Sequence, residues 1–340
     1  MTVLENYSLE NLNTFRLRSV ARYFVVIKND TDLIEAVYLS RKVKLPIFIL
    51  GGGSNLVLSE NLNAVVLKSE IKGKGTHHVN SYIVRVTLGS GEDWDETVNF
   101  CVKNNYAGLE NLSGVPGTVG ASAVQNIGAY GVEAGEFISS VETFDLTTLT
   151  KKVWLAKDCE FGYRDSVFKK PGNKKYFITK VNFDLRVGGQ PRLSYRDLQD
   201  HFIGRNPTIK EVREFVIKIR REKMPDLTVC GCAGSFFKNP VISKDHYEAL
   251  IDVYPGVPKY VLPDGRIKIP LAFILDHVCH LKGLKWGNLS LYEKQPLVLV
   301  NFGGGTVIDI ENFAQSIFDS VKNKTNIEIE WEAEKVDFNK

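Results

Sequence analysis

Two glycine-rich segments are the first places where the residue types suggest chemistry. The first, residues 47–55, reads Ile-Phe-Ile-Leu-Gly-Gly-Gly-Ser-Asn, an apolar run that enters a glycine turn with hydroxyl and amide side chains. Glycines let main-chain N–H groups approach an anionic oxygen closely. A Rossmann dinucleotide site requires Gly-x-Gly-x-x-Gly followed by a helix, whereas the residues after Asn55 have the composition of a strand. This segment alone indicates either an anion-binding loop or an ordinary glycine turn, and it argues against a Rossmann fold.

The second segment, residues 110–131, contains five glycines, a proline and several small polar residues directly after a predicted helix. This is more conformational freedom than a turn requires, which indicates that a large ligand lies against the main chain. A cofactor with a pyrophosphate group is the simplest candidate for this ligand, because main-chain amides bind phosphate oxygens where no side chain intervenes.

The composition limits the class of protein. The 340 residues, 44% of them hydrophobic, are enough for two or three domains. Lys and Arg number 43 against 40 Asp and Glu, a net charge of +3, which is too even for a nucleic-acid binder that relies on one basic field. No apolar run in the sequence reaches the ~18 residues of a membrane span. We expect a globular protein without a nucleic-acid or membrane partner.

The amino terminus and the cysteines indicate a cellular compartment. The first 15 residues contain Glu5 and Glu10 and lack the apolar stretch of a secretory signal. The five cysteines are scattered along the chain, which is typical of reduced thiols. Cys230, Cys232 and the Asp-His-Val-Cys-His run at 276–280 lack the usual spacing of zinc ligands. We expect a cytoplasmic protein without a metal site.

The elements that position the glycine segments are mostly short strands in the first two hundred residues. Strand composition bounded by turn residues occurs at 23–28, 47–50, 64–68, 82–88, 141–144 and 176–185. A helix is predicted from Trp94 to Asn105. Asp93 and Glu96 form a capping pair at its start, and Gly108 follows its end.

Helices dominate from Thr208 onward. Thr208 and Glu211 form a capping box that opens a helix ending before Pro225. Further helices are predicted at 243–253, 270–281 and 310–322, and further strands at 297–301 and 327–331. A cluster of glycine, asparagine and proline predicts a domain boundary near 204–208.

Four motifs follow one another in a characteristic order. They are Gly-Gly-Gly-Ser-Asn at 51–55, Ser-Gly-Val-Pro-Gly-Thr-Val-Gly-Ala at 113–121 with Gln-Asn-Ile-Gly-Ala-Tyr-Gly at 125–131, Phe-Gly-Tyr-Arg-Asp-Ser-Val-Phe at 161–168, and Gly-Ser-Phe-Phe-Lys-Asn-Pro at 234–240. Together they resemble the UDP-N-acetylenolpyruvoylglucosamine reductases, in the form with a tyrosine loop. The resemblance covers about residues 13–334, nearly the whole chain.

The resemblance implies an α+β fold and a flavoenzyme. The implied architecture is an FAD-binding region of the vanillyl-alcohol-oxidase (PCMH) type at 13–205, divided roughly into 13–70 and 71–205, followed by a smaller α+β substrate domain at 206–336. The implied reaction is reduction of the enolpyruvyl group of UDP-N-acetylglucosamine enolpyruvate to UDP-N-acetylmuramate, a step of peptidoglycan synthesis in the cytoplasm. Non-covalent FAD supplies the hydride, NADPH reduces the flavin, and we expect a monomer.

The same resemblance assigns roles to individual residues. It assigns cofactor binding to residues of both glycine segments. They are Gly51, Gly52, Gly53, Ser54, Asn55, Ser113, Gly114, Gly117, Thr118, Gly120, Ala121, Gln125, Asn126 and Gly128. Arg164 is expected beside the substrate carboxylate, where a guanidinium suits a developing enolate. Ser235 is expected to donate the proton, and Glu334 to lie close to the enolate as an acid or a polarising group.

The substrate end and the departures from the family pattern complete the expected site. Tyr195 in the tyrosine loop, Lys223 and Asn239 are expected at the nucleotide diphosphate, and Tyr163 as a wall of the pocket. Ala333 and Lys335 replace the usual proline and valine around Glu334, so that Glu332 remains an alternative for its role. Cys232 stands where the family usually has asparagine.

Two other functions are consistent with parts of the pattern. An FAD-dependent oxidase of the same superfamily usually carries its flavin covalently on His or Cys in the glycine segments, and residues 47–60 and 107–131 contain neither. A nucleotide-binding regulator has no need for a proton donor at Ser235 or a guanidinium at Arg164. The reductase is therefore the favoured interpretation.

Overall fold

The computed structural model describes residues 1–338. They form two compact units that are not contiguous in sequence. Unit 1 comprises residues 1–7, 21–52 and 63–220, and unit 2 comprises residues 8–20, 53–62 and the chain from 221 onward. This division differs from the boundary expected near 204–208. The difference arises from packing, because Phe15 and Leu17 of residues 8–20 and Val57 of residues 53–62 lie in the hydrophobic core of unit 2.

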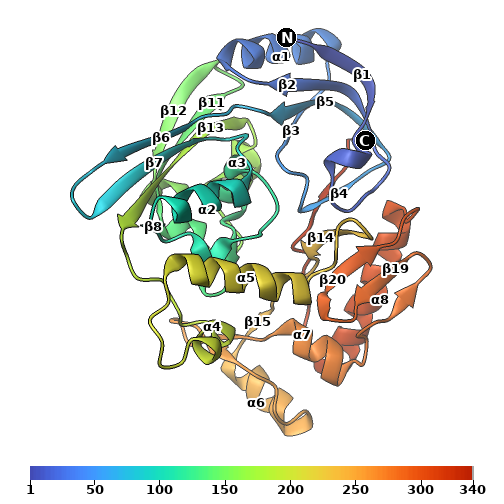
Figure 1. The fold of residues 1–340 in the computed structure, drawn as a ribbon. Coiled ribbons are helices and arrows are strands. Elements are labelled where there is room, and N and C mark those ends of the chain that lie inside the picture. Colours follow the sequence, from blue (N-terminus) through green and yellow to red (C-terminus); the bar gives the residue numbers. More distant parts are fainter. Residues whose placement is uncertain (339–340) are drawn as a thin grey trace. The chain divides into compact units, whose positions relative to one another are not determined.

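A four-stranded sheet forms the first part of unit 1, in the order β1-β2-β5-β3 (Figure 1). Its elements are β1 (Val3–Ser8), β2 (Val20–Ile27), β3 (Ile47–Leu50), β5 (Asn61–Ser69) and the helix α1 (Asp30–Val43). The side chain of Asn29 caps α1 by accepting a hydrogen bond from the Asp32 amide (3.0 Å). β3 and β5 run parallel, and β3 ends directly before the first glycine segment.

A six-stranded antiparallel sheet forms the second part of unit 1. Its strands are β12 (Thr150–Leu155), β11 (Ile138–Asp145), β13 (Tyr176–Val187), β7 (Ile83–Gly89), β6 (Lys74–His78) and β8 (Tyr106–Ala107). The helices α2 (Trp94–Lys103) and α3 (Val119–Gln125) lie side by side, and α3 packs against β13 and β7 (Figure 1). Trp94 and Phe183 meet in the core with ring centroids 5.9 Å apart. The second glycine segment begins after α2 and includes α3.

Short elements and two helices complete unit 1. The short elements are β9 (Gly128–Ala129), β10 (Val132–Glu133) and the 3-10 turns Glu110–Leu112, Ala134–Glu136, Ala156–Cys159, Val167–Lys169 and Pro171–Asn173. The helices are α4 (Arg196–His201) and α5 (Ile209–Lys223), whose last residues pass into unit 2. The predicted capping box of α5 is confirmed, because Thr208 N donates to Glu211 Oε2 (2.8 Å) and Glu211 N donates to Thr208 Oγ1 (3.2 Å).

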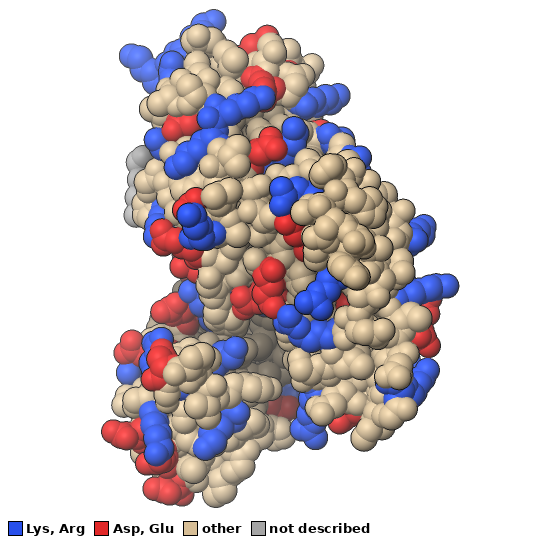
Figure 2. All heavy atoms as spheres, turned by 90° about the vertical axis from the view of Figure 1, so that its left-hand side faces the viewer, with Lys and Arg blue, Asp and Glu red and all other residues tan. Residues whose placement is uncertain are grey.

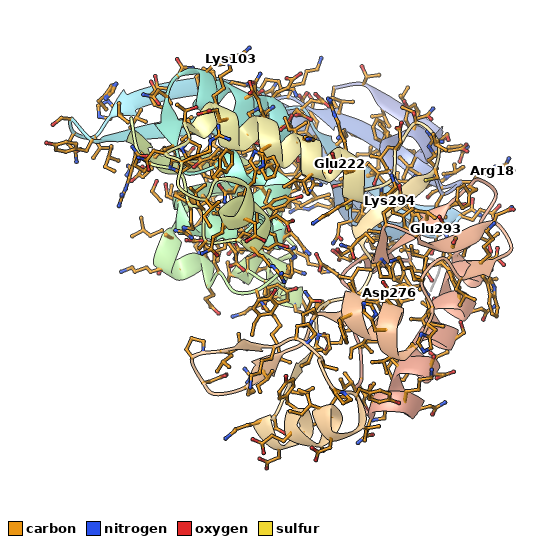
Figure 3. The ribbon with its side chains drawn as sticks, turned by 60° about the horizontal axis from the view of Figure 1, so that its bottom comes forward. Arg18, Lys103, Glu222, Asp276, Glu293 and Lys294 are labelled. Atoms are coloured by element: carbon orange, nitrogen blue, oxygen red, sulfur yellow. The ribbon has the colours of Figure 1, made fainter. Side chains whose placement is uncertain are left out.

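Unit 2 is built around a four-stranded sheet, β14-β20-β19-β18, on which α8 packs against β19 (Figure 1). The elements are β14 (Gly231–Ser235), β18 (Lys285–Trp286), β19 (Leu289–Tyr292), β20 (Gln295–Asn301) and α8 (Val307–Thr325). Glu293 and Lys294, labelled in Figure 3, form the turn between β19 and β20.

Smaller elements flank this sheet. They are the 3-10 turn Glu10–Leu12, β4 (Leu56–Leu58), β15 (Val241–Ile242), α6 (Lys244–Val253), β16 (Tyr260–Val261), β17 (Ile267–Lys268), α7 (Leu271–Phe273) and β21 (Glu334–Val336). The predicted helix at 243–253 is confirmed, and Ser243 caps it by accepting from the His246 amide (3.1 Å). β21 pairs with β4 in parallel, with Glu334 opposite Leu56.

Two predicted elements are wrong in detail. The helix predicted over 270–281 is shorter, because α7 continues as a π-helix (Ile274–Val278) and His280 takes the left-handed conformation at φ 57°. The strand predicted over 327–331 is an extended segment with a single bridge, from Trp331 to Phe237. Buried Ile327 and Ile329 do alternate with exposed glutamates, as in a strand. A strand also requires a series of hydrogen bonds to a neighbouring strand, and this segment has only the single bridge.

The surface agrees with the even charge balance of the sequence. Basic and acidic side chains are interspersed over the face shown in Figure 2. All five cysteines are free and buried. Among residues 1–338, no helix combines the length and apolar character that a membrane crossing requires. The same residues contain no grouping of three or more His, Cys, Asp or Glu able to hold a metal ion.

Candidate active site

The two glycine segments meet within unit 1. A Cβ atom on Gly52 would lie 2.5 Å from the Cα atom of Gly117, and one on Gly51 would lie 3.0 Å from the Cβ atom of Ala121. The first distance is far below any real Cβ contact with a main-chain atom, so Gly52 is required where the two main chains touch. Two segments far apart in the sequence therefore form one surface of main chain.

Polar groups at this surface are left without protein partners. Within the described residues, the amides of Gly52, Gly117 and Thr118 donate no hydrogen bond. The buried Nε2 atom of Gln125 also has no partner, although its Oε1 atom accepts from Lys169 Nζ (2.9 Å). Unpaired donors of this kind are costly unless a ligand or water satisfies them. An anionic cofactor that accepts from main-chain amides fits this donor set.

The other predicted cofactor residues have local hydrogen bonds. Ser113 is buried, and its Oγ donates to the carbonyl of Glu110 (2.6 Å). Thr118 caps α3 by accepting from the Ala121 amide (3.5 Å). In unit 2, Gly53 has φ 66°, and a Cβ atom there would lie 2.0 Å from the Leu12 carbonyl oxygen, so no other residue fits that position.

A tight turn in unit 1 carries Arg164. Gly162 and Asp165 exchange main-chain hydrogen bonds of 3.0 and 3.1 Å, which leaves Tyr163 and Arg164 at the tip. Arg164 has φ 55°, a conformation that costs about 1 kcal/mol or more for a residue with a side chain. Such strain persists where the surroundings enforce it.

Side chains of the second glycine segment and of Lys169 hold this turn. Asn126 Nδ2 donates to the Gly162 carbonyl (2.8 Å) and to Glu133 Oε2 (2.9 Å), while its Oδ1 accepts from the Gly135 amide (2.8 Å). Lys169 Nζ donates to the Arg164 carbonyl (2.9 Å). The Asn126 amide is thus fully engaged in holding the loop.

The Arg164 side chain extends back over the same glycine segment. A Cβ atom on Gly128 would lie 2.9 Å from Arg164 Nη1, so the absence of a side chain at Gly128 makes room for the guanidinium. The Arg164 Cζ atom lies 5.5 Å from the ring centroid of Tyr163. A permanent positive charge at this position is suited to binding a carboxylate.

In unit 2, main-chain hydrogen bonds bring Ser235 next to the carboxy-terminal glutamates. Ser235 is the last residue of β14 and follows Gly234, which has φ 75°. The carbonyl of the next residue, Phe236, accepts from the amide of Glu332 (2.8 Å) and from that of Ala333 (3.4 Å). The half-buried Ser235 is therefore followed by a residue that is bonded to the segment carrying Glu332 and Glu334.

The strand of Glu334 is tied to the end of the first glycine segment. Glu334 N donates to the Asn55 carbonyl (2.8 Å), and Asn55 Nδ2 donates to the Glu332 carbonyl (3.1 Å). Lys335, one of the departures from the family pattern, forms an ion pair with Glu311 on α8. Lys238, which follows Ser235 by three residues, pairs with Glu330 (3.0 Å).

The predicted substrate residues are distributed over both units. Tyr195 of unit 1 is exposed, and its ring meets that of Tyr130 edge to face with centroids 5.2 Å apart. Burial raises the pKa of Tyr130 to about 12. In unit 2, Asn239 Oδ1 accepts from the Leu271 amide (2.9 Å). Lys223 is exposed in the last turn of α5, beside Glu222, which Figure 3 labels.

The structure thus brings Arg164 to the second glycine segment in unit 1. In unit 2 it joins Phe236, the residue after Ser235, to Glu332 and Ala333, the two residues before Glu334. Sequence reasoning missed Lys169, whose ammonium links Gln125 to the Arg164 turn. It lies in a Lys-Lys-Pro run that is typical of a solvated surface, so no signal identified it. Asp95 of α2, which accepts from the Gly114 amide, and Arg213 of α5, which pairs with Asp95, were also missed, because isolated charged residues on helices are typical of a solvated face.

Comparisons with known proteins identify the family of the chain. Residues 21–149 match the model of an FAD binding domain, and residues 225–336 match that of the UDP-N-acetylenolpyruvoylglucosamine reductase C-terminal domain. These matches confirm the predicted α+β fold with an FAD-binding region and a reductase C-terminal domain.

Full-length relatives carry the same name. The chain is 39% identical to UDP-N-acetylenolpyruvoylglucosamine reductase of Ralstonia nicotianae, with 96% of each chain covered. It is 41% identical to that of Cupriavidus pinatubonensis, covering 96% of this chain and 97% of the relative. The crystal structure of the reductase from Thermus caldophilus has the same fold, with a TM-score of 0.67, 21% identity and 98% of each chain covered. The chain therefore belongs to the UDP-N-acetylenolpyruvoylglucosamine reductase family and is an FAD-containing oxidoreductase.

Proposed function

We propose that this chain reduces the enolpyruvyl group of UDP-N-acetylglucosamine enolpyruvate with electrons from NADPH, giving UDP-N-acetylmuramate for peptidoglycan synthesis. The observation that carries the proposal is the meeting of the two glycine segments, where unpartnered amides and the orphaned Gln125 Nε2 fit an anionic cofactor. Membership of the reductase family supports the choice of substrate.

The cofactor would be held by main chain more than by side chains. We assign FAD binding to the residues predicted from the two glycine segments, at 51–55, 113–121 and 125–128. Bound FAD supplies the hydride that no amino-acid side chain can provide. The side chains and the main-chain amides of Ser113 and Asn126 are already engaged in protein hydrogen bonds, so these two residues would fix the shape of the loop around the cofactor.

Arg164 would bind the substrate carboxylate. Its charge is permanent, and its turn is fixed by Asn126 and Lys169 before any ligand arrives. A preorganised guanidinium stabilises the negative charge that spreads into an enolate as the double bond is reduced. Tyr163 would close one side of the pocket.

Ser235 would deliver the proton to the carbon next to the carboxylate. A hydroxyl is a weak acid, but an enolate carbon is a strong base, so the transfer is feasible where the alkoxide is stabilised. Glu334 would lie near the enolate, as its strand is fixed on Asn55 and follows directly the segment bonded to Phe236. Tyr195, Lys223 and Asn239 would contact the uridine diphosphate. We also propose that the enzyme acts as a cytoplasmic monomer.

The proposal is tested on the purified protein. A yellow protein that releases FAD on acid precipitation, and that consumes NADPH when UDP-N-acetylglucosamine enolpyruvate is added, supports the reductase. Flavin that remains attached after precipitation would favour the covalent oxidase instead. Bound FAD without substrate-dependent NADPH consumption would contradict the proposed reaction.

A further inference from the structure

The peptide groups around Gly114 are held from two helices within unit 1. The Gly114 amide donates to Asp95 Oδ1 of α2 (2.6 Å), and the Gly114 carbonyl accepts from Arg220 Nε of α5 (3.0 Å). Gly114 itself has φ 69°. A Cβ atom there would lie 3.3 Å from Arg220 Cδ, so a side chain would both strain the main chain and press on Arg220.

Asp95 is in turn fixed by a bidentate ion pair. Arg213 Nη1 donates to Asp95 Oδ1 (2.6 Å), and Arg213 Nη2 donates to Asp95 Oδ2 (2.9 Å). The Arg213 side chain is 10% exposed and that of Asp95 is 37% exposed. Burial raises the pKa of Asp95, but the Arg213 and Gly114 hydrogen bonds outweigh it and hold that pKa below its ordinary value. The carboxylate is thus charged when it accepts from Gly114.

One face of α5 supplies both arginines. Arg213 and Arg220 are seven residues apart, which places them on the same side of a helix. Ile217 lies between them, and its Cγ1 would be 3.9 Å from a Cβ atom on Gly114. Arg220 also lies beside the Tyr130 hydroxyl of the same glycine segment. α5 therefore contacts the second glycine segment directly through Arg220 and Ile217, and it acts on that segment indirectly through the Arg213–Asp95 pair.

The hydrogen bonds around Gly114 are more numerous than the packing of a glycine loop requires. A bidentate Arg–Asp pair fixes direction as well as distance, and here its carboxylate orients one N–H group three residues before Gly117. The amides of Gly117 and Thr118 have no partner among the described residues. An oriented loop with free donors loses less conformational entropy on binding an anion than a mobile loop does.

We propose that Asp95, Arg213 and Arg220 are positioning residues that preset the main chain of residues 113–118 for the pyrophosphate of FAD. The inference rests on the proposed function in that this loop is taken to bind the cofactor. It predicts that the flavin affinity depends on the hydrogen bond from Gly114 to Asp95, beyond any effect of the ion pair on folding.

Two double variants separate these effects. Asp95→Asn with Arg213→Met keeps a side-chain oxygen for the Gly114 amide, whereas Asp95→Ala with Arg213→Met removes it. Neither variant leaves a buried unpaired charge, which a single substitution of Asp95 would, because the Arg213 side chain is only 10% exposed. The dissociation constant of FAD is measured by flavin fluorescence, and the unfolding midpoint of the flavin-free protein by circular dichroism.

A second Arg–Asp pair in unit 1 provides the matched control. Arg85 donates to both oxygens of Asp184 (2.7 Å each) across β7 and β13. The corresponding variants are Asp184→Asn with Arg85→Met and Asp184→Ala with Arg85→Met. These are expected to bind FAD with the same dissociation constant as the wild type.

We expect Asp95→Ala with Arg213→Met to bind FAD at least about tenfold more weakly than Asp95→Asn with Arg213→Met, with closely similar unfolding midpoints. Equal dissociation constants for the two variants would overturn the inference, as would an equal loss in the control pair. A wild-type protein that binds no FAD would instead overturn the proposed function.

Discussion

The two units hold their candidate catalytic residues by different kinds of contact. In unit 1, side chains fix the Arg164 turn, because the Asn126 amide and the Lys169 ammonium bond to its carbonyl groups. In unit 2, main-chain bonds fix Ser235 and Glu334, through Phe236 and the parallel pairing of β21 with β4.

This difference determines which substitutions the candidate residues of each unit tolerate. A side-chain clamp is lost when one residue changes, and its buried partners are left unsatisfied. A main-chain ladder depends little on the identity of the side chains along it. Of the departures from the family pattern, Lys335 lies in the ladder of β21 with β4. Ala333 precedes that ladder, and its amide donates to the Phe236 carbonyl (3.4 Å), a hydrogen bond that the usual proline could not make.

Gly52→Ala is expected to have the largest effect, because the new Cβ atom would overlap the main chain of Gly117 at 2.5 Å. Neither main chain can yield as a flexible side chain would, so we expect a loss of about 3 kcal/mol or more in the free energy of unfolding. FAD binding should be lost with it. Denaturant unfolding and flavin fluorescence measure the two losses.

Gly75→Ala is the control for that substitution. A Cβ atom on Gly75, in the strand β6 of the same unit, would meet Thr87 Cβ at an ordinary 4.0 Å. We expect no loss of stability from this change. If Gly52→Ala proved as stable as Gly75→Ala and retained FAD, the convergence of the glycine segments would be disproved.

Asn126→Ala is expected to come next. It removes the three hydrogen bonds that hold Gly162, Glu133 and Gly135, at a cost of about 2–4 kcal/mol in unfolding free energy. The Arg164 turn loses its support, so KM for the substrate should rise. Asn104→Ala, which removes one exposed bond to the Phe100 carbonyl, is the control, and an equal effect on KM from both would contradict the clamp.

Acid should weaken unit 1 through its paired carboxylates. The hydrogen bonds of Arg85 hold the pKa of Asp184 below its ordinary value, so the pair stabilises the fold above about pH 4 and the contribution is lost as the pH falls through the folded-state pKa. We expect Asp184→Asn to cost about 0.5–1 kcal/mol at pH 7, since both side chains are partly exposed. The difference in unfolding free energy between the variant and the wild type should shrink as the pH falls below about 4, and a constant difference at acid pH would refute the assignment.

Lys335→Ala should have the smallest effect. Its ion pair with Glu311 is about two-fifths exposed on both sides, and pairs of this kind contribute about 0–1 kcal/mol. Turnover should be unchanged, because the strand of Glu334 is held by Asn55 and β4. A tenfold fall in kcat, by about 1.4 kcal/mol in the barrier, would mean that side chains also position this strand.

Local structure was largely predictable from the sequence. The strand at 47–50 has the predicted bounds, and the caps of α2 and α5 are the residue pairs expected at their starts. Caps and periodicity are local properties, so they are visible without knowledge of the fold.

Long-range contacts were not predictable. The alternation at 327–331 is correct, but whether an extended segment has a partner strand is decided elsewhere in the chain. The helix α5 was predicted from its capping box, whereas the contact of Arg213 with Asp95 joins residues far apart in sequence. The meeting of Gly52 with Gly117 is of the same kind, since each segment alone resembles a flexible loop.

The most direct test of the account is the pair of half-reactions in Ser235→Ala. Reduction of bound flavin by NADPH and its reoxidation by the enolpyruvyl substrate are followed separately by stopped-flow absorbance. The account predicts that flavin reduction proceeds at the wild-type rate while reoxidation by the substrate slows by about 10²–10⁴-fold, the contribution of a positioned proton donor. Equal slowing of both half-reactions, or an unchanged reoxidation rate, would contradict it.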